Sequence, residues 1–296
     1  MEPSLCPACG SLPNAQPRRA ANYELWECSD CGLFFHARPS PEATEDLYEA
    51  GYFTGKETFG VGYEDYEKGG VWEASVRWPS LGRELEALVP SKGRLLDVGC
   101  AYGFFVDEAS KAGWHGIGID VSRFAIQEGR RRGLDLRAGT LEEASFEDGF
   151  FDAIICIQTL EHLPDPAGTL EELARIARRG GALVIDVPSS DSLGFRLRKE
   201  RWEQIKPPEH LQYFGKKSLF RLLRRAGWQP IKSSSLYDPV YAIAAADAVE
   251  EHLGKSATLK KLAVRMASAA GLLKLIRNRG LGTFLRVMAV KTGDSP

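Results

Sequence analysis

The stretch of nine residues from Leu95 to Gly103, Leu-Leu-Asp-Val-Gly-Cys-Ala-Tyr-Gly, constrains the fold of this chain more than any other. Its apolar start predicts a buried strand, and its glycines predict a tight turn that opens a helix. Seventeen residues after Gly103, a second short apolar run ends in Asp120. A strand, a glycine turn, a helix and an acid at the end of the next strand form a nucleotide-binding βαβ unit. We therefore expect an α/β fold that binds a nucleoside cofactor.

The turn itself indicates which kind of cofactor. Dinucleotide sites use G-x-G-x-x-G, where backbone amides at a helix N-terminus hold a pyrophosphate. Here the turn runs from Gly99 to Gly103, and Asp97 lies two residues before its first glycine. A carboxylate there would repel a pyrophosphate, whereas it would attract a cofactor that carries an ammonium and a sulfonium.

This turn resembles the glycine-rich first motif of class I S-adenosylmethionine (SAM) methyltransferases. Four further segments resemble later motifs of that family in the same order, at residues 139–143, 151–158, 160–166 and 178–185. The resemblance covers about residues 90 to 235 and implies a Rossmann-like, seven-stranded methyltransferase sheet. The alternative is a Rossmann-like fold that binds another ligand.

The resemblance also implies which residues bind SAM. Asp97, Gly99 and Gly103 would shape the methionine pocket, Asp120 would bind the ribose, and Thr140 and Leu141 would flank the adenine. The remaining predicted cofactor-binding residues are their neighbours Cys100, Ala101 and Val121, together with Gln158 at the end of the fourth strand. We interpret Cys100 and Cys156 as small packing residues rather than nucleophiles.

Two C-x-x-C pairs near the N-terminus predict a zinc ribbon over residues 1–40. Cys6 and Cys9 are separated by eighteen residues from Cys28 and Cys31, close to the spacing of four-cysteine zinc sites. Four thiolates close a tetrahedral shell, so the metal would be structural. In so short a segment it would supply most of the folding energy. The alternatives are two disulfides, disfavoured in a reducing cytosol, and a ribbon that has lost its metal.

The rest of the chain divides into four further parts. Residues 41–90 predict a helical cap rich in aromatics, in which Tyr63 or Tyr66 contacts the cofactor or simply packs on the core. Residues 91–238 form the SAM-binding catalytic core, 239–280 a helical insertion, and 281–296 the last strand and tail. Residues 255–279 predict a basic amphipathic helix. It packs on its own domain, forms a lid or a homodimer contact, or lies on a membrane surface.

Composition excludes several classes of function. A net charge of −2 over 296 residues argues against binding along a phosphate backbone, so nucleic acid is an unlikely partner. No uncharged apolar run reaches the roughly 20 residues of a membrane span, which predicts no transmembrane segment. The N-terminus lacks the basic and apolar regions of a secretory signal, so we expect a cytoplasmic protein.

Methyl transfer to a weak nucleophile needs a base near the ends of the fourth and fifth strands. His162 follows the fourth strand, and the pair Glu209 and His210 follows the fifth. The Glu-His-x-x-Tyr-Phe pattern resembles that of deoxysugar C-methyltransferases, which also carry a four-cysteine zinc segment. That resemblance implies that His210 is the base and that Glu209 lies beside it. The chain lacks that family's long C-terminal domain and has Pro207 and Pro208 before the motif, and its layout looks equally like bacterial glycan and natural-product methyltransferases.

The sequence therefore predicts a SAM-dependent methyltransferase that acts on a small molecule: a sugar, a glycan precursor or a natural product. One alternative is an RNA methyltransferase that grips its substrate with the ribbon. Few basic residues in the ribbon, and Gln-Thr-Leu-Glu after the fourth strand where base-methylating enzymes carry Asn-Pro-Pro-Tyr, argue against it. The other alternative is a non-catalytic SAM-binding scaffold.

Overall fold

The computed structural model describes residues 5–14, 16–20, 23–36, 48, 50–54, 66–236 and 278–293. The strands are β1 (Arg18–Ala20), β2 (Tyr23–Glu27), β3 (Phe34–His36), β4 (Arg94–Val98), β5 (His115–Asp120), β6 (Leu136–Ala138), β7 (Phe151–Ile157), β8 (Ala177–Pro188), β9 (Gln212–Tyr213), β10 (Trp228–Leu236) and β11 (Phe284–Lys291). The helices are α2 (Ala50–Thr54), α3 (Tyr66–Leu88), α4 (Phe104–Lys111), α5 (Arg123–Arg130), α6 (Leu141–Ala144), η2 (Leu160–His162), α7 (Pro166–Ile176), α8 (Leu193–Arg198), η3 (Lys199–Arg201) and α9 (Lys216–Arg225).

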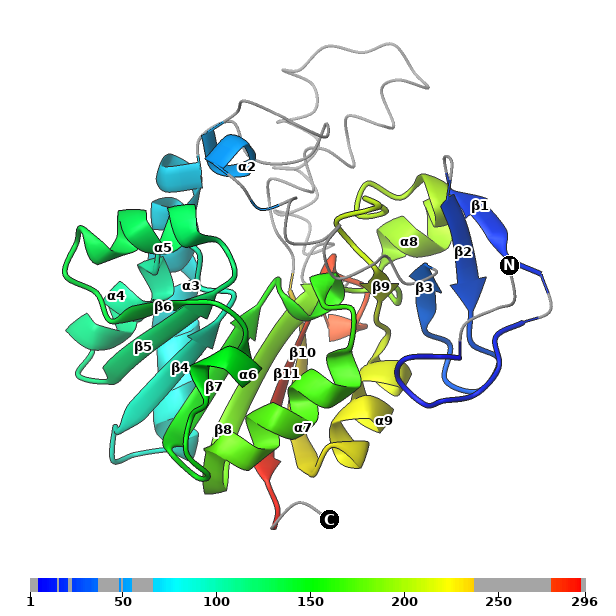
Figure 1. The fold of residues 1–296 in the computed structure, drawn as a ribbon. Helices are drawn as coiled ribbons and strands as arrows, with labels where there is room; N and C mark the ends of the chain where they lie inside the picture. The colour runs from blue at the N-terminus through cyan, green and yellow to red at the C-terminus, as the bar shows by residue number, and fades with distance from the viewer. Residues whose placement is uncertain are drawn as a thin grey trace.

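The larger of the two sheets has seven strands in the order β10-β11-β8-β7-β4-β5-β6 (Figure 1). The five strands from β8 to β6 are parallel, and β11 runs antiparallel between β8 and β10. The predicted Rossmann-like seven-stranded sheet is confirmed. The order reverses between β4 and β7, which is where open α/β sheets bind their ligands.

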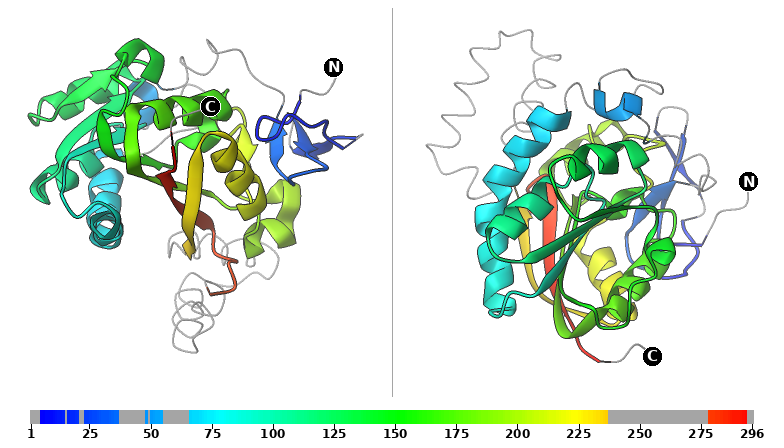
Figure 2. Two further views of the ribbon diagram at one scale, coloured as in Figure 1. Left: turned by 90° about the horizontal axis from the view of Figure 1, so that it is seen from below. Right: turned by 60° about the vertical axis from the view of Figure 1, so that its left-hand side comes forward.

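Helices cover both faces of this sheet, because its parallel strands are apolar on both sides. In β4, Leu95 packs on one face with Trp78, Leu81 and Leu85 of α3. Its neighbour Leu96 packs on the other face, in a core that includes residues of α7 and α9. Figure 2 shows α3 (cyan) on one side of the sheet and α9 (yellow) on the other. In both cores, helices distant in the sequence pack against the strands of the sheet.

Strand β8 contains the whole motif at residues 178–185, including its two glycines. It runs from Ala177 to Pro188. Its pairing with β7 steps from Phe151↔Ala177 to Ala153↔Ala182, so the two glycines lie in an irregularity inside the strand. Gly180 has φ 73°, a conformation that glycine adopts without strain.

The second sheet joins the N-terminal segment to the catalytic core. Its order is β1-β2-β3-β9, and β9 comes from the loop that follows β8, far along the chain. The buried cysteines of the segment and Phe35 belong to the same hydrophobic core as α7, α9 and the large sheet. The Arg225 guanidinium donates to the Ala8 carbonyl oxygen at 2.9 Å. The ribbon is therefore packed into the catalytic core.

Parts of the predicted organisation lie outside the described residues. These are Tyr63, most of the segment 41–65, and the insertion 239–280 apart from its last three residues. The basic amphipathic helix predicted at 255–279 falls there almost entirely, so its role stays a prediction. Among the helices that are described, none is long and apolar enough to cross a membrane.

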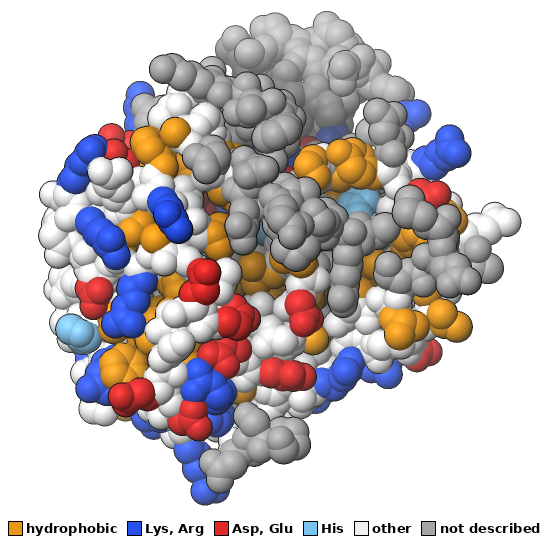
Figure 3. All heavy atoms as spheres, viewed as in Figure 1, with side chains coloured by type: hydrophobic (Ala, Val, Ile, Leu, Met, Phe, Trp, Pro, Cys, Tyr) orange, Lys and Arg blue, Asp and Glu red, His pale blue; other side chains and the backbone are white. Residues whose placement is uncertain are grey.

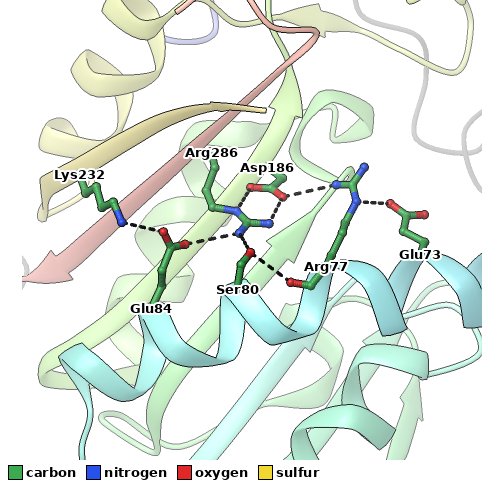
Figure 4. A network of polar contacts seen from close by, with 7 residues as sticks. All are labelled: Glu73, Arg77, Ser80, Glu84, Asp186, Lys232 and Arg286. Atoms are coloured by element: carbon green, nitrogen blue, oxygen red, sulfur yellow. Dashed lines mark hydrogen bonds and ion pairs between the residues drawn. The ribbon is translucent and has the colours of Figure 1, made fainter. Parts of the chain in front are cut away.

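A chain of alternating charges ties helix α3 to the middle of the sheet (Figure 4). Arg286 on β11 binds both oxygens of Asp186 on β8, each at 2.7 Å, and Arg77 on α3 lies 3.4 Å from the same carboxylate. Asp186 is fully buried and Arg286 is 3% exposed. Glu73 pairs with Arg77 at 3.0 Å. A charge pair buried so deeply is costly to break, because the remaining partner stays in a low-dielectric core.

We expect Arg286→Met to lower the free energy of unfolding by about 3–5 kcal/mol, because Asp186 loses its bidentate partner. Urea denaturation measures this free energy. Arg286→Lys keeps the positive charge but cannot bind both carboxylate oxygens, so its stability should lie between those of the wild type and Arg286→Met. Lys111→Met is the control: Lys111 is 61% exposed, and its ion pairs contribute little. An Arg286→Met protein as stable as Lys111→Met would contradict this assignment.

Candidate functional site

A cavity of about 720 Å³ opens at the carboxyl ends of β4, β5 and β7. Its walls come from the glycine turn, from helices α2 and α3, and from the segments that follow β7 and β8. The predicted site residues among its lining are Asp97, Gly99, Cys100, Ala101, Asp120, Val121, Thr140, Leu141, Gln158, His162, Glu209 and His210. Except for Gly103, which does not line this cavity, the structure brings the predicted cofactor residues and the predicted base into one cavity.

The glycine turn brings backbone close to this cavity. Gly99 has φ 73°, and a Cβ there would lie 2.3 Å from Thr159 Oγ1. Gly103, which caps the N-terminus of α4, has φ 75° and is packed against Leu134 and Leu136. Ala101 between them has φ 45°, a strained value for a residue with a side chain. Such strain is concentrated at ligand-binding turns.

Asp120, at the end of β5, holds the glycine turn in place. One carboxylate oxygen accepts from the Ala101 amide and the other from the Ser122 amide, each at 2.8 Å. Burial raises the pKa of this carboxyl. A carboxylate offers about four acceptor positions, so two remain for ribose hydroxyls.

Asp97 on β4 is the most exceptional acid of the site. It is 2% exposed and lines the cavity, yet its Oδ2 has no hydrogen-bond partner within the described part of the chain. Burial, and secondarily the charge of Asp120, raises its pKa to about 8. Two neighbouring carboxylates with one orphaned oxygen fit a ligand that brings an ammonium group, as SAM does.

Thr140, Leu141 and Gln158 also line the cavity. Thr140 caps helix α6 through a capping box with Glu143, which leaves Leu141 in the first turn, facing the cavity. Gln158, after β7, has φ 52° and an Nε2 atom that is buried with no partner among the described residues. The backbone amide of Gln158 donates to the backbone carbonyl oxygen of Asp186 at 2.8 Å. Asp186, whose side chain belongs to the charge network of Figure 4, thus also supports this wall.

Aromatic side chains of the cap close the cavity over the glycine turn. Phe53 of α2 and Tyr66 of α3 pack against Tyr102, with ring centroids 5.5 and 5.1 Å apart, respectively. Tyr66 and Phe53 both line the cavity. Tyr66 therefore packs on the core and also lines the cavity, and its contact with the cofactor stays a prediction.

His210 lines the cavity and is held through one of its ring nitrogens. Its Nδ1 lies 2.8 Å from the Gln204 carbonyl oxygen, which only accepts, so Nδ1 carries the hydrogen and Nε2 the lone pair. Burial, and secondarily the neighbouring His162 and Lys206, lowers the pKa of His210 well below its ordinary value. The ring is therefore neutral, with its lone pair on Nε2.

His162 and Glu209 surround this ring. The two imidazoles meet edge to face with centroids 4.8 Å apart. His162 Nδ1 donates to the Glu209 carbonyl oxygen at 2.9 Å, and the Tyr48 hydroxyl lies 3.0 Å from the same nitrogen. The Tyr52 hydroxyl donates to the Glu209 carboxylate at 2.7 Å. The cap helix is thus bonded directly to the segment that carries the predicted base.

Glu161 was quoted in the sequence motif but not predicted as a site residue. It is fully buried, and neither carboxylate oxygen has a hydrogen-bond partner among the described residues. Burial, and secondarily the charges of Glu209 and Asp186, raises its pKa to about 8. Donor atoms of Glu161, His162 and His210 lie within 4.8 Å of one another, a set that also suits a divalent cation. No local pattern distinguishes this glutamate from a surface one.

The four cysteines of the ribbon also converge. Cys6 Sγ lies 3.6 Å from Cys31 Sγ, and Cys9 Sγ lies 3.4 Å from Cys28 Sγ. All four sulfurs lie within 4.8 Å of one another, and all are free thiols. A tetrahedral zinc with Zn–S bonds of about 2.3 Å places its sulfurs about 3.8 Å apart. The donor set and its spacing fit zinc, whereas two disulfides would need much shorter separations.

Comparison with known proteins identifies the catalytic core. The family described as "Methyltransferase domain" matches residues 74–233, more than half of the chain. The chain belongs to this methyltransferase family. The predicted SAM-dependent methyltransferase domain is confirmed.

Two similar curated proteins are ubiquinone biosynthesis O-methyltransferases. That of Hahella chejuensis is 38% identical over 116 residues, 37% of this chain and 48% of its own length. That of Xanthomonas axonopodis is 31% identical over 166 residues, 51% of this chain and 70% of its own. The methyltransferase thus spans about half the length of the first of these relatives.

A solved structure shows the same fold. The SAM-dependent methyltransferase of Archaeoglobus fulgidus superposes with a TM-score of 0.51 and 18% identity, over 77% of this chain and 100% of the other.

The raised pKa of Asp97 predicts how ligand affinity depends on pH. An ammonium group binds the ionised carboxylate, which forms as the pH rises toward about 8. The affinity for S-adenosylhomocysteine should therefore rise between pH 6 and 8, by at most about tenfold per pH unit. Calorimetric titration measures this. Asp97→Asn should weaken binding and flatten the dependence, whereas Asp107→Asn, at an exposed carboxylate of α4, should keep it. If the affinity of the wild-type protein did not change across this pH range, the role of Asp97 would be refuted.

Proposed function

We propose that this methyltransferase transfers the methyl group of SAM to a hydroxyl of a small molecule: a sugar, a glycan precursor or a natural product. The observation that supports this most directly is that His210, His162 and Glu209 share one cavity with the SAM-binding residues. The names of the relatives support an oxygen acceptor, since both are O-methyltransferases of ubiquinone biosynthesis.

The proposed chemistry needs a positioned hydroxyl and a proton acceptor. SAM supplies an electrophilic methyl group, and the bond from the acceptor oxygen to this carbon forms as the carbon–sulfur bond breaks. His210 Nε2 takes the hydroxyl proton, because Nδ1 is already committed to Gln204. The Gln204 carbonyl oxygen, which accepts from Nδ1, stabilises the positive charge that then forms on the ring. The aromatic cap excludes water from the reacting groups.

The ribbon and the surface support a small acceptor rather than RNA. None of the described residues between 5 and 36 lines the cavity. On the face shown in Figure 3, acidic and basic side chains are mixed over the described part of the surface. A polyanion binds where positive charge is concentrated.

Methyl-labelled SAM tests the class of acceptor. The purified enzyme is incubated with labelled SAM and an extract of its own cells, and the products are separated by size. We expect label in the low-mass fraction, where mass spectrometry gives the mass of the acceptor. Label in nuclease-sensitive polymer would overturn the proposal in favour of RNA, and the absence of any transfer would favour a scaffold.

Substituting the predicted base separates catalysis from binding. We expect His210→Gln to lower the rate of labelling of the low-mass acceptor by at least about 10²-fold, because general bases contribute 10²- to 10⁴-fold. The affinity for S-adenosylhomocysteine should stay within about threefold of wild type. His115→Gln, at an exposed position on β5, is the matched control and should leave the rate unchanged. A His210→Gln enzyme that retains the wild-type rate would refute the base role.

We also propose that the ribbon holds one structural zinc ion through Cys6, Cys9, Cys28 and Cys31. The spacing of the four sulfurs supports this, and a closed shell of four thiolates leaves no position for substrate.

Metal analysis of variants tests the zinc site. We expect about one zinc per chain in the wild type and almost none in Cys31→Ser, since three thiolates bind zinc far more weakly in a ribbon this short. Cys156→Ala removes a buried thiol of β7 and should keep its zinc. S-adenosylhomocysteine should still bind to Cys31→Ser, because the cavity lies apart from the described ribbon. Full zinc content in Cys31→Ser would contradict this ligand set.

A further inference from the structure

We propose that the ribbon positions the catalytic base, and that Tyr213 is the residue through which it does so. This inference rests on the proposed role of His210 and extends it to residues outside the cavity. Tyr213 and His36 do not line the cavity, so each would act through the segment that carries His210.

The segment after Pro208 is held from two sides. On one side it joins the ribbon sheet, where Phe34 pairs with Tyr213 and the His36 amide donates to the Leu211 carbonyl oxygen at 2.9 Å. On the other side the Leu211 amide donates to the Glu161 carbonyl oxygen at 2.8 Å. The Gln212 side chain donates to the Leu163 carbonyl oxygen at 2.6 Å. The ribbon and the turn after β7 thus clamp the two residues that follow His210.

Tyr213 connects the ribbon to His210 itself. Its hydroxyl donates to the His210 carbonyl oxygen at 3.1 Å, and His36 Nε2 lies 3.1 Å from the same hydroxyl. His36 Nδ1 lies 2.8 Å from the Glu24 carbonyl oxygen, so Nδ1 carries the hydrogen and Nε2 is an acceptor. The single hydrogen of the Tyr213 hydroxyl is therefore shared between the His210 carbonyl oxygen and His36 Nε2, and this hydroxyl joins ribbon strand β3 to the backbone of the predicted base.

Burial makes this connection rigid. Tyr213 is fully buried and packs edge to face on His36, with ring centroids 5.6 Å apart. Trp202, Phe34 and Phe195 surround it in a small core of ribbon and catalytic-domain residues. A shift of the ribbon would therefore move the His210 backbone, and small displacements of a catalytic group cost rate steeply.

The test removes only the hydroxyl. We expect Tyr213→Phe to lower the rate of methyl transfer to the labelled low-mass fraction by about tenfold, as loss of a supporting hydrogen bond does at other sites. The KM for SAM and the affinity for S-adenosylhomocysteine should stay within about twofold, because the cofactor residues are untouched. Amide hydrogen exchange of residues 206–214 should become faster, while that of residues 94–120 should not change.

The chain offers a matched control. Tyr23 lies on β2 of the same sheet, is 40% exposed and packs on the other side of the His36 ring. Tyr23→Phe deletes the same atom without touching the segment of His210, and should leave both the rate and the exchange unchanged. A Tyr213→Phe enzyme within twofold of the wild-type rate would overturn the proposal.

A double substitution separates positioning from general stability. If Tyr213 acts through His210, Tyr213→Phe should cause no further loss of rate in a His210→Gln background. Two losses that multiply would show that Tyr213 supports the enzyme in another way, and would also overturn the proposal. Failure of the proposed function gives a different result, namely a His210→Gln enzyme that is as active as wild type.

Discussion

The pairing of β3 with β9 is the contact on which the arrangement of the site depends. It joins an N-terminal ribbon to a two-residue strand almost two hundred positions away in the sequence. Without it, the segment from Lys206 to Phe214 would lose its bonds to the ribbon and keep only those to the turn after β7, to the cap helix and to the residues that follow β8. With it, His210 is fixed between two rigid elements, as a catalytic side chain on an irregular segment requires.

Buried acids set the electrostatics of the cavity. Asp97, Asp120 and Glu161 are each removed from water, and burial raises the pKa of all three. Asp97 Oδ2 and both Glu161 oxygens are buried without a hydrogen-bond partner among the described residues. A positively charged ligand group would offset the cost of ionising such acids. The ammonium of SAM is a group of this kind.

The local features of the fold could be predicted from the sequence. The last strand, predicted within residues 281–296, is β11, an apolar run bounded by clear breaks. For the glycine turn and the four cysteines, the spacing of the residues in the sequence indicates the kind of site they form. Contacts between residues far apart in the sequence leave no such pattern. A two-residue strand such as β9 has no measurable period, and the pairing of Arg286 with Asp186 joins residues one hundred positions apart.

For the candidate base, too, the sequence predicts the residue but not its contacts. The Glu-His pair predicted His210 as a residue of the site, and the structure places it in the cavity. Its orientation follows from the Gln204 carbonyl group, and its support follows from Tyr213 and His36. Backbone carbonyl groups look alike in every sequence, so such contacts are visible only in the fold. The same holds for Glu161, whose burial no local signal reveals.

A crystal structure with bound S-adenosylhomocysteine tests the central claim most directly, that one cavity holds both the methyl donor and the base. The account predicts the amino group of the ligand at Asp97, the ribose at Asp120, and the sulfur turned toward the side of the cavity where His210 presents Nε2. A ligand bound elsewhere, or one whose sulfur faces away from His210 with Asp97 still unpaired, would contradict the account.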